Sequence, residues 1–376
     1  MTAICTVIIF LLMVSVHEFG HFIVAKKSGM EVTEFAIGMG PAILKKEKGG
    51  TLYSIRILPL GGYCRITDEL TEDASAFVHP VWKRFLMIIA GPVLNVVLGF
   101  VLILILVSIS GGFMSTEIAE LSKGAHMEEA GFKEGDKIIK INDSRIFFYE
   151  DITFAQNDFE KNKPIRITVK RGKEKISAEV MPTESITTYQ YNNDGIKIIN
   201  ITGENREEDF IPYSDEVPRE NFPVGTEEVS QRLIMGFVAA KEKPDPVNVM
   251  YQSVCYTGFV VKLVYKSFVM LVTGQVSMDN VSGPVGIVQQ VNDAVHSGFR
   301  YILNLSALLT INLGVFNLLP VPALDGGRLV FIFIEFIRRK PVPPEKEGMV
   351  HAVGMILLLL FAAFISYKDV MKIITK

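Results

Sequence analysis

The sequence has 376 residues, of which 49% are hydrophobic, and its mean hydropathy is +0.32. This apolar content exceeds what a soluble protein of this size needs and indicates a membrane protein. The formal net charge of −3 gives no reason to expect nucleic-acid binding. The three cysteines (Cys5, Cys64 and Cys255) are odd in number and far apart, which excludes a disulfide framework and a thiolate zinc site.

The first predicted element is an apolar stretch from residue 1 to about residue 24. It is long enough to cross ~30 Å of hydrocarbon as a helix. No Lys or Arg precedes it and no small-residue cleavage site follows it. We therefore expect this segment to be retained and not removed as a signal peptide.

The motif HEFGH at residues 17–21 lies inside this first span. On a helix His17 and His21 fall one turn apart on the same face, so both can bind one zinc ion while Glu18 acts as a general base. The alternative is a helix end with solvated histidines, since Lys26 and Lys27 follow closely. Ionisable side chains in an apolar span cost on the order of a few kcal/mol each unless paired or metal-bound, which favours the zinc site.

A second span is predicted at about residues 85–111, and residues 1–111 form the N-terminal membrane half. Asn95 lies within this span. It is either a polar contact between helices or part of the catalytic cavity, and the sequence leaves both alternatives open.

Residues 112–183 are predicted to form a PDZ-like α+β domain. AGFKEGDKIIKIN at 130–142 is typical of a helix end, a glycine turn and a strand, and IRITVKRGKEKISAEV at 165–180 indicates a hairpin. The glycines and apolar residues at 130–142 resemble the PDZ signature of membrane and envelope proteases, although an unrelated small β domain remains an alternative. Residues 184–246 are polar, acidic and expected to be partly irregular, and we assign them no chemistry.

Residues 247–298 are predicted to be an amphipathic interfacial region, because Lys262 and Lys266 share one face of an otherwise apolar helix. Residues 299–376 form the C-terminal membrane half, with spans at about 299–320 and 349–367. The fold class expected is therefore a polytopic α-helical membrane protein with four transmembrane helices.

The third zinc ligand must come from outside the first span, because a catalytic zinc ion normally has three protein ligands. Asp325 is the best candidate. It lies in NLLPVPALDGG at residues 317–327, where two prolines and two glycines interrupt the third span near its end. Irregular backbone at membrane depth is tolerated only beside protein or a cavity. The alternative is a solvated Asp325 that caps the next helix.

Positive charges predict the orientation, because short segments rich in Lys and Arg stay on the cytoplasmic side. Such residues follow the first span at positions 26–84 and the third span at positions 328–340. Both loops should be cytoplasmic, and the long 112–246 insert and both termini extracytoplasmic. His17, His21 and Asp325 then lie near the same cytoplasmic face.

These motifs together resemble the site-2 protease family of the bacterial RseP/RasP type. HEFGH and NLLPVPALDGG occur with further matching segments in the expected order, namely GMGP at 38–41, LPLGGY at 58–63, AGPVLN at 90–95 and SGPVGI at 282–287. One departure is that the insert holds one PDZ-like domain and an acidic tract, where the best-known enterobacterial members carry two PDZ domains in tandem.

The resemblance implies an intramembrane zinc metalloprotease of the bacterial inner membrane. Its substrates would be transmembrane segments of single-pass proteins, such as anti-sigma factors or remnant signal peptides. It implies zinc bound by His17, His21 and Asp325, Glu18 as the base, and Asn317 as a group that positions substrate or polarises the scissile carbonyl. It also makes residues 51–66 a membrane-associated β-loop that pairs with unwound substrate, through Ile55, Ile57, Leu58, Gly61, Gly62 and Tyr63.

Two other classes of protein compete with this interpretation. A transporter or channel also places ionisable groups and broken helices in the membrane, but it usually has paired repeats, which the sequence lacks. A catalytically inactive receptor acting through the PDZ-like insert would not need an intact H-E-x-x-H motif. His351 has no potential ligand at zinc-binding spacing and is expected to be a surface or interfacial residue.

Overall fold

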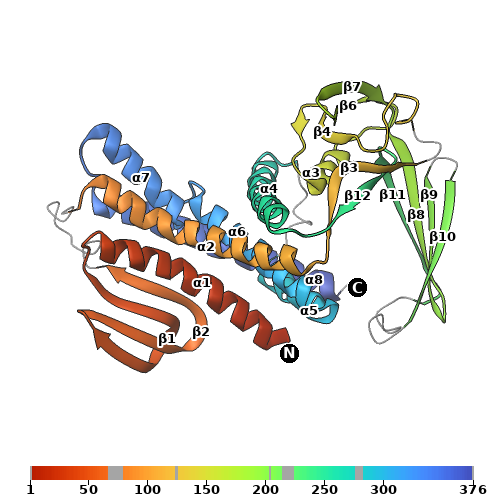
Figure 1. The fold of residues 1–376 in the computed structure, drawn as a ribbon. Coiled ribbons are helices and arrows are strands. Elements are labelled where there is room, and N and C mark those ends of the chain that lie inside the picture. The colour runs from red at the N-terminus through yellow and green to blue at the C-terminus, as the bar shows by residue number, and fades with distance from the viewer. Residues whose placement is uncertain are drawn as a thin grey trace. The chain divides into compact units, whose positions relative to one another are not determined.

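The computed structural model describes residues 2–66, 79–122, 126–202, 205–213, 224–275 and 283–374. The chain forms two compact units (Figure 1). One contains residues 1–106 and 257–376, and the other contains residues 107–256. Each unit is described by itself below.

The first unit is built from long apolar helices (Figure 1): α1 (Thr2–Lys27), α2 (Val81–Ile109), α6 (Phe299–Leu318) and α8 (Pro344–Ile374), with the shorter α5 (Pro284–Ser297) and α7 (Asp325–Arg338). Leu357, Leu359 and Leu360 on α8 are each at least 60% exposed. A run of exposed leucines is unfavourable in water and favourable in hydrocarbon, so this surface fits a lipid environment.

Among the residues described, five helices are long and apolar enough to cross a membrane, one more than the four spans expected. Four of them, α1, α2, α6 and α8, match the predicted spans. The fifth is α4 (Pro246–Val272), whose length and composition also suffice for a crossing. These helices are consistent with a multi-pass membrane protein, and the four-span count stays a prediction.

A long antiparallel hairpin of β1 (Val32–Lys48) and β2 (Thr51–Ile66) follows α1. Gly49 and Gly50 form its turn with positive φ, which glycine adopts without steric cost. The predicted β-loop at residues 51–66 is therefore strand β2. Near the open end of the hairpin, Glu34 accepts hydrogen bonds from Ser54 and from Arg56 at 2.8 and 2.6 Å.

The short helix α5 connects three of the long helices. Its buried Val291 packs against Ile9 and Met13 of α1. At its N-terminus the backbone N–H groups of Gly283 and Gly286 donate to the buried Asp369 carboxylate of α8, at 2.9 and 2.8 Å. The carboxylate satisfies two of the amide groups that a helix N-terminus leaves unpaired. Of the predicted SGPVGI segment, Ser282 lies outside the described residues.

The second unit contains a sheet in the order β12-β3-β4-β6-β7. Its strands are β3 (Phe113–Leu121), β4 (Lys137–Ile141), β6 (Ile165–Arg171), β7 (Glu174–Val180) and β12 (Phe237–Glu242); β5 (Ser144–Arg145) pairs with β4, and α3 (Tyr149–Gln156) lies between β5 and β6 in the chain. The predicted hairpin at 165–180 is present as β6 and β7. Alternating apolar residues of these strands form a core with Phe132 and Met235.

The segment 184–246 is more regular than its polar composition suggested. Its described part forms β9 (Gly195–Thr202), β10 (Asn205–Pro212) and β11 (Glu227–Ile234), which with β8 (Thr183–Tyr191) make a sheet in the order β10-β9-β8-β11. Regular strands thus occur within a segment expected to be partly irregular, because cross-strand pairing stabilises polar strands that lack a strong apolar pattern. Residues 203–204 and 214–223, with several of the acids, lie outside the described residues. Because β12 pairs with β3, the first sheet also extends beyond the predicted boundary at residue 183.

Candidate metal centre and active site

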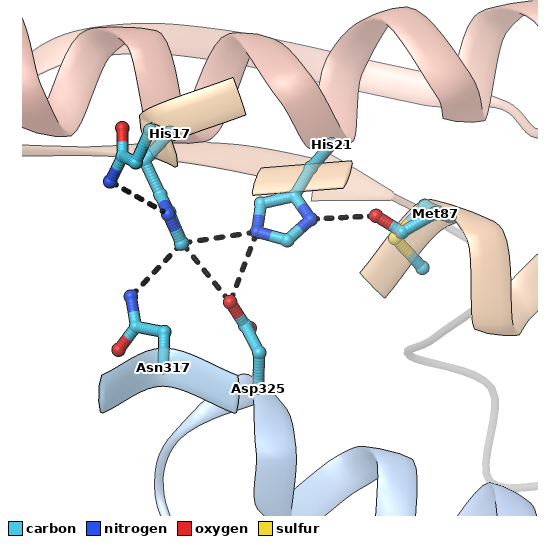
Figure 2. A network of polar contacts seen from close by, with 6 residues as sticks. His17, His21, Met87, Asn317 and Asp325 are labelled. Atoms are coloured by element: carbon cyan, nitrogen blue, oxygen red, sulfur yellow. Dashed lines mark hydrogen bonds and ion pairs between the residues drawn. The ribbon is translucent and has the colours of Figure 1, made fainter. Parts of the chain in front are cut away.

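His17 and His21 project from one face of α1, as their spacing predicts (Figure 2). Their Nε2 atoms are 3.2 Å apart and the ring planes cross at 82°. Both side chains are buried, at 8% and 9% exposure. Two ring nitrogens that meet at this distance inside an apolar helix bundle need a proton or a cation between them.

Asp325 brings a carboxylate to the same point from a distant part of the chain (Figure 2). Its Oδ2 atom lies 3.1 Å from Nε2 of His17 and 3.4 Å from Nε2 of His21. Asp325 is the first residue of α7, which begins after a short irregular loop at residues 319–324. The structure thus places Asp325 beside His17 and His21, the three residues for which the sequence predicts a shared metal ion.

The loop before Asp325 requires both of the following glycines. A Cβ atom on Gly326 would lie 2.0 Å from the carbonyl oxygen of Leu319, and one on Gly327 would lie 2.6 Å from that of Val321. The chain after α6 therefore turns back on itself with backbone against backbone. This tight return is what places a residue of α7 beside the end of α6.

The three convergent atoms fit a zinc ion. In tetrahedral coordination, bonds of about 2.0–2.1 Å place neighbouring ligand atoms about 3.3 Å apart. The observed separations of 3.1, 3.2 and 3.4 Å match this value. Oδ2 of Asp325 is buried and, within the described ranges, has no hydrogen-bond donor. A buried carboxylate oxygen without a donor is energetically costly. A divalent cation held by His17, His21 and Asp325 together would remove that cost.

A hydrogen bond at the other ring nitrogen prepares His21 for metal binding. Its Nδ1 lies 2.8 Å from the backbone carbonyl of Met87 on α2, which can only accept (Figure 2). The proton of the neutral ring is therefore on Nδ1, and the lone pair of Nε2 points to His17 and Asp325. The backbone of α2 thus leaves Nε2 as the His21 nitrogen that is free to bind a metal.

Asn95 of α2 has the corresponding place beside His17. Its Nδ2 is 3.4 Å from Nδ1 of His17, and its Oδ1 is buried with no hydrogen-bond partner among the residues described. Rotating the amide by half a turn lets Oδ1 accept a proton from Nδ1–H of His17 and leaves Nε2 free for the metal. Of the two alternatives left open for Asn95, the geometry favours the catalytic cavity.

Sequence comparison identifies the family to which this site belongs. The profile described as Peptidase family M50 matches residues 5–361. A protein of Clostridium acetobutylicum is 32% identical over 98% of this chain and 96% of its own length. The zinc metalloprotease RasP of Oceanobacillus iheyensis and the regulator of sigma-W protease RasP of Bacillus subtilis are each 28% identical over 99% of both chains. The chain belongs to peptidase family M50. It is a zinc metalloprotease of the site-2 protease type.

The M50 site needs α1 and α2 in very close contact. A Cβ atom on Gly20 would lie 2.4 Å from the carbonyl oxygen of Ala90, and one on Gly91 would lie 2.3 Å from Nε2 of His21. Small residues at a helix interface let the two backbones approach each other in the membrane. Gly20 and Gly91 therefore make room for the His21 ring and for its bond to the Met87 carbonyl.

Glu18 lies between the helix and the hairpin. Its side chain faces β2, where a Cβ atom on Gly62 would lie 3.4 Å from Cγ of Glu18, and its carboxyl interacts with the backbone of Cys64. Glu18 directly follows His17 on α1, next to the face that carries the two histidines. This is the place expected for the base of an H-E-x-x-H site. The predicted β-loop residue Gly62 is thus beside the predicted base.

Asn317 reaches the M50 site from the end of α6 (Figure 2). Its Nδ2 is 3.4 Å from Nε2 of His17. The amide group is therefore within reach of any group bound at the metal centre. This placement is compatible with the predicted role in holding substrate.

The other predicted substrate residues lie along β2. Ile55, Ile57 and Leu58 are about half exposed, and Gly61 adopts φ +81° opposite the side chain of Met39. The Tyr63 ring lies under the guanidinium groups of Arg56 and Arg65, with centroid distances of 5.2 and 5.7 Å. The structure brings Gly62 beside Glu18, whereas Ile55, Ile57 and Leu58 present exposed side chains further back along β2.

Sequence reasoning missed two contributors to this site. The Met87 carbonyl carries no side-chain signal, so only the fold could identify it. His351 was expected to be a surface or interfacial residue without a ligand role; its side chain is half-buried and contacts the loop before Asp325. The clue available in the sequence was its place in a predicted span, where a histidine is costly unless it has a partner.

Proposed function

We propose that this M50 protein hydrolyses peptide bonds within transmembrane segments of single-pass membrane proteins. One observation carries the proposal: a buried His17, His21 and Asp325 cluster lies inside a bundle of helices that are long enough to span a membrane. A soluble substrate has no access to such a site, whereas a membrane segment can approach it sideways. The family membership supplies the chemistry, and the burial of the site supports the membrane location of the substrate.

In this proposal His17, His21 and Asp325 hold the zinc ion, which supplies Lewis-acid polarisation and lowers the pKa of water to about 7 when bound. Glu18 accepts the proton of the attacking water and passes it to the leaving amine. Met87 and Asn95 keep the two imidazoles in the tautomer that binds metal. Asn317 donates a hydrogen bond to the substrate backbone beside His17.

We further propose that β2 binds the substrate as an added strand. A peptide carbonyl within a helix is hydrogen-bonded and shielded, so the substrate must unwind before attack. Unwound backbone in a membrane needs hydrogen-bond partners, and the edge of a hairpin provides them. The exposed Ile55, Ile57 and Leu58 would contact the apolar side chains, and Gly61 to Tyr63 would bring the strand past Glu18.

The proposed location is the bacterial inner membrane, with the active site near the cytoplasmic face and the 107–256 unit outside. The distribution of Lys and Arg in the short loops supports this orientation. The resemblance of 112–183 to PDZ domains suggests that this unit selects substrates by size or docking. Anti-sigma factors and remnant signal peptides are the proposed substrate class, and the name of the Bacillus subtilis relative, regulator of sigma-W protease, is compatible with it.

Glu18→Gln tests the proposal most directly. The variant keeps the shape of the side chain but cannot accept a proton, so cleavage of a model transmembrane substrate should fall at least about 100-fold while zinc content persists. Gel analysis of substrate and product in proteoliposomes, with metal analysis of the same sample, provides the measurement. Glu31→Gln, an exposed glutamate just after α1, is the matched control and should cleave normally. Cleavage by the Glu18→Gln form at the native rate would remove Glu18 from the mechanism.

A further inference from the structure

The loop at residues 319–324 is held in a strained shape just before the proposed ligand Asp325. Ala323 has φ +75°, a value that residues other than glycine rarely adopt. Within the loop, N–H of Val321 bonds to the carbonyl of Leu319 and N–H of Leu324 bonds to that of Val321. These local bonds leave the N–H of Ala323 to be satisfied from elsewhere.

His351 of α8 supplies that partner. Its Nδ1 accepts a hydrogen bond from the backbone N–H of Ala323 at 2.9 Å. The proton of the neutral ring is then on Nε2, which lies 3.9 Å from the Glu347 carboxylate one turn earlier. The Phe331 ring of α7 packs against the imidazole, with centroids 5.7 Å apart. The imidazole is thus fixed between α7, α8 and the loop.

Gly354, three residues further along the same face of α8, brings the helix against the same loop. A Cβ atom at this position would lie 2.4 Å from Cβ of Pro322 and 2.8 Å from its carbonyl oxygen. The helix backbone therefore touches the residue next to Ala323. His351 and Gly354 contact consecutive residues of one loop and together define where it lies.

We propose that His351 is a positioning residue for the metal centre: by accepting the Ala323 N–H, it holds the loop in the conformation that aims Asp325 at His17 and His21. The inference rests on the proposed ligand role of Asp325. Without the acceptor, the Ala323 amide loses its partner and the backbone relaxes away from positive φ. Because Asp325 is only two residues further on, its carboxylate then moves from the ring nitrogens.

Zinc release tests this proposal without any need for peptide cleavage. The full-length protein in detergent is loaded with zinc, and loss of the metal to an excess of chelator is followed with a zinc-sensitive dye. His351→Leu should release zinc about tenfold faster, the scale on which outer contacts affect metal sites. His351→Asn should stay within about twofold of the native rate, because Oδ1 of Asn can replace Nδ1 as the acceptor.

Gly354→Ala is a second, independent variant, because it displaces the loop while leaving the imidazole in place. It should also release zinc faster, whereas Val353→Ala, on an exposed part of α8, should not. Native release rates in His351→Leu or in Gly354→Ala would overturn the proposal. So would His351→Asn releasing zinc as fast as His351→Leu. If the His351→Leu protein does not accumulate in cells, the zinc-release rate of Gly354→Ala tests the proposal instead. A protein that holds zinc as expected but cleaves no membrane segment would refute the proposed function alone.

Discussion

Each imidazole of the proposed zinc site is oriented by a group on α2 that is not itself a proposed ligand. Met87 presents a carbonyl to Nδ1 of His21, and Asn95 presents an amide to Nδ1 of His17. These contacts come from one helix, so α2 aligns both ligands at once. H-E-x-x-H thus specifies the ligands, and the neighbouring helix specifies their tautomers.

The role of Asn95 leads to a prediction for zinc affinity. Asn95→Ala removes the acceptor for Nδ1–H of His17 and should weaken zinc binding roughly 10- to 100-fold, measured by competition with a chelator of known affinity. Asn95→Asp keeps an oxygen at the same place and should bind zinc more tightly than the alanine variant. Equal affinities for the alanine variant and the native protein would show that His17 needs no orienting group.

At the scale of secondary structure, the M50 site depends on how closely α1 and α2 pack. Apolar composition alone predicts that these segments are helices in a membrane, but it does not predict which faces meet. Gly20 and Gly91 determine which faces of α1 and α2 meet, because any larger residue at either position would separate the two backbones and push the His21 ring out of place.

Gly91→Ala is therefore expected to reduce both zinc binding and cleavage at least about tenfold, because the new methyl group overlaps the His21 ring. Gly258→Ala is the matched control: Gly258 also lies within a helix, α4, but a Cβ atom there would have no neighbour within 4 Å. Metal analysis and substrate cleavage provide the two measurements. Equal loss in both variants would indicate a general effect on the helices and not on the site.

In the second unit, an ion pair between the buried carboxylate of Asp136 and the partly exposed guanidinium of Arg171 determines a pH dependence. Arg171 donates hydrogen bonds to Asp136, and these hold the pKa of the Asp136 carboxyl below its ordinary value of 3.8. A lowered folded-state pKa means that the pair stabilises the unit above the unfolded-state pKa and loses this effect as the pH falls through the folded-state pKa.

Asp136→Asn should accordingly destabilise this unit by about 2–4 kcal/mol at pH 7, and the difference from the native protein should shrink below about pH 4. Hydrogen exchange of the paired strand residues Ile138 and Val169 in the full-length protein reports the change. Glu117→Gln, which removes the exposed ion pair to Lys137, should cost less than about 1 kcal/mol. A pH-independent difference for Asp136→Asn would contradict the explanation.

At the scale of the whole chain, the direction in which each helix runs limits how many of the five candidate spans can cross the membrane once. α1 runs from Ile9, beside α5, to His17. α2 runs the opposite way, because Met87 contacts His21 whereas Asn95, further along α2, contacts His17. α6 begins directly after α5 and reaches His17 at Asn317. The end of α2 and the start of α6 therefore lie at the same end of the helix bundle. A single crossing by α4 between them would place them at opposite faces, so chain direction favours the predicted interfacial position of α4.

Cysteine labelling tests the position of α4. In a protein with Cys5, Cys64 and Cys255 replaced by serine, Val247→Cys and Val272→Cys place thiols near the two ends of α4, where both native side chains are at least 70% exposed. A membrane-impermeant maleimide added outside cells should label both. Labelling of Val272→Cys only after permeabilisation would make α4 a fifth span and would require another crossing before α6.

The sequence by itself determined the local features of this protein. Apolar length identified the helices, the four-residue spacing put His17 and His21 on one helical face, and alternation with a glycine turn identified the hairpin of β6 and β7. These features depend on neighbours in the chain, so periodicity reveals them. The motif around Asp325 was also visible, because its prolines and glycines break a predicted span.

Only the tertiary structure decided which distant groups complete the site. The Met87 carbonyl, the His351 contact with Ala323 and the approach of Gly91 to His21 join positions far apart in the sequence through backbone atoms or a single histidine. The regular strands within 184–246 depended in the same way on partners elsewhere. Such contacts leave no periodic pattern, because their free energy comes from packing between elements and not from the residues next to them in the chain.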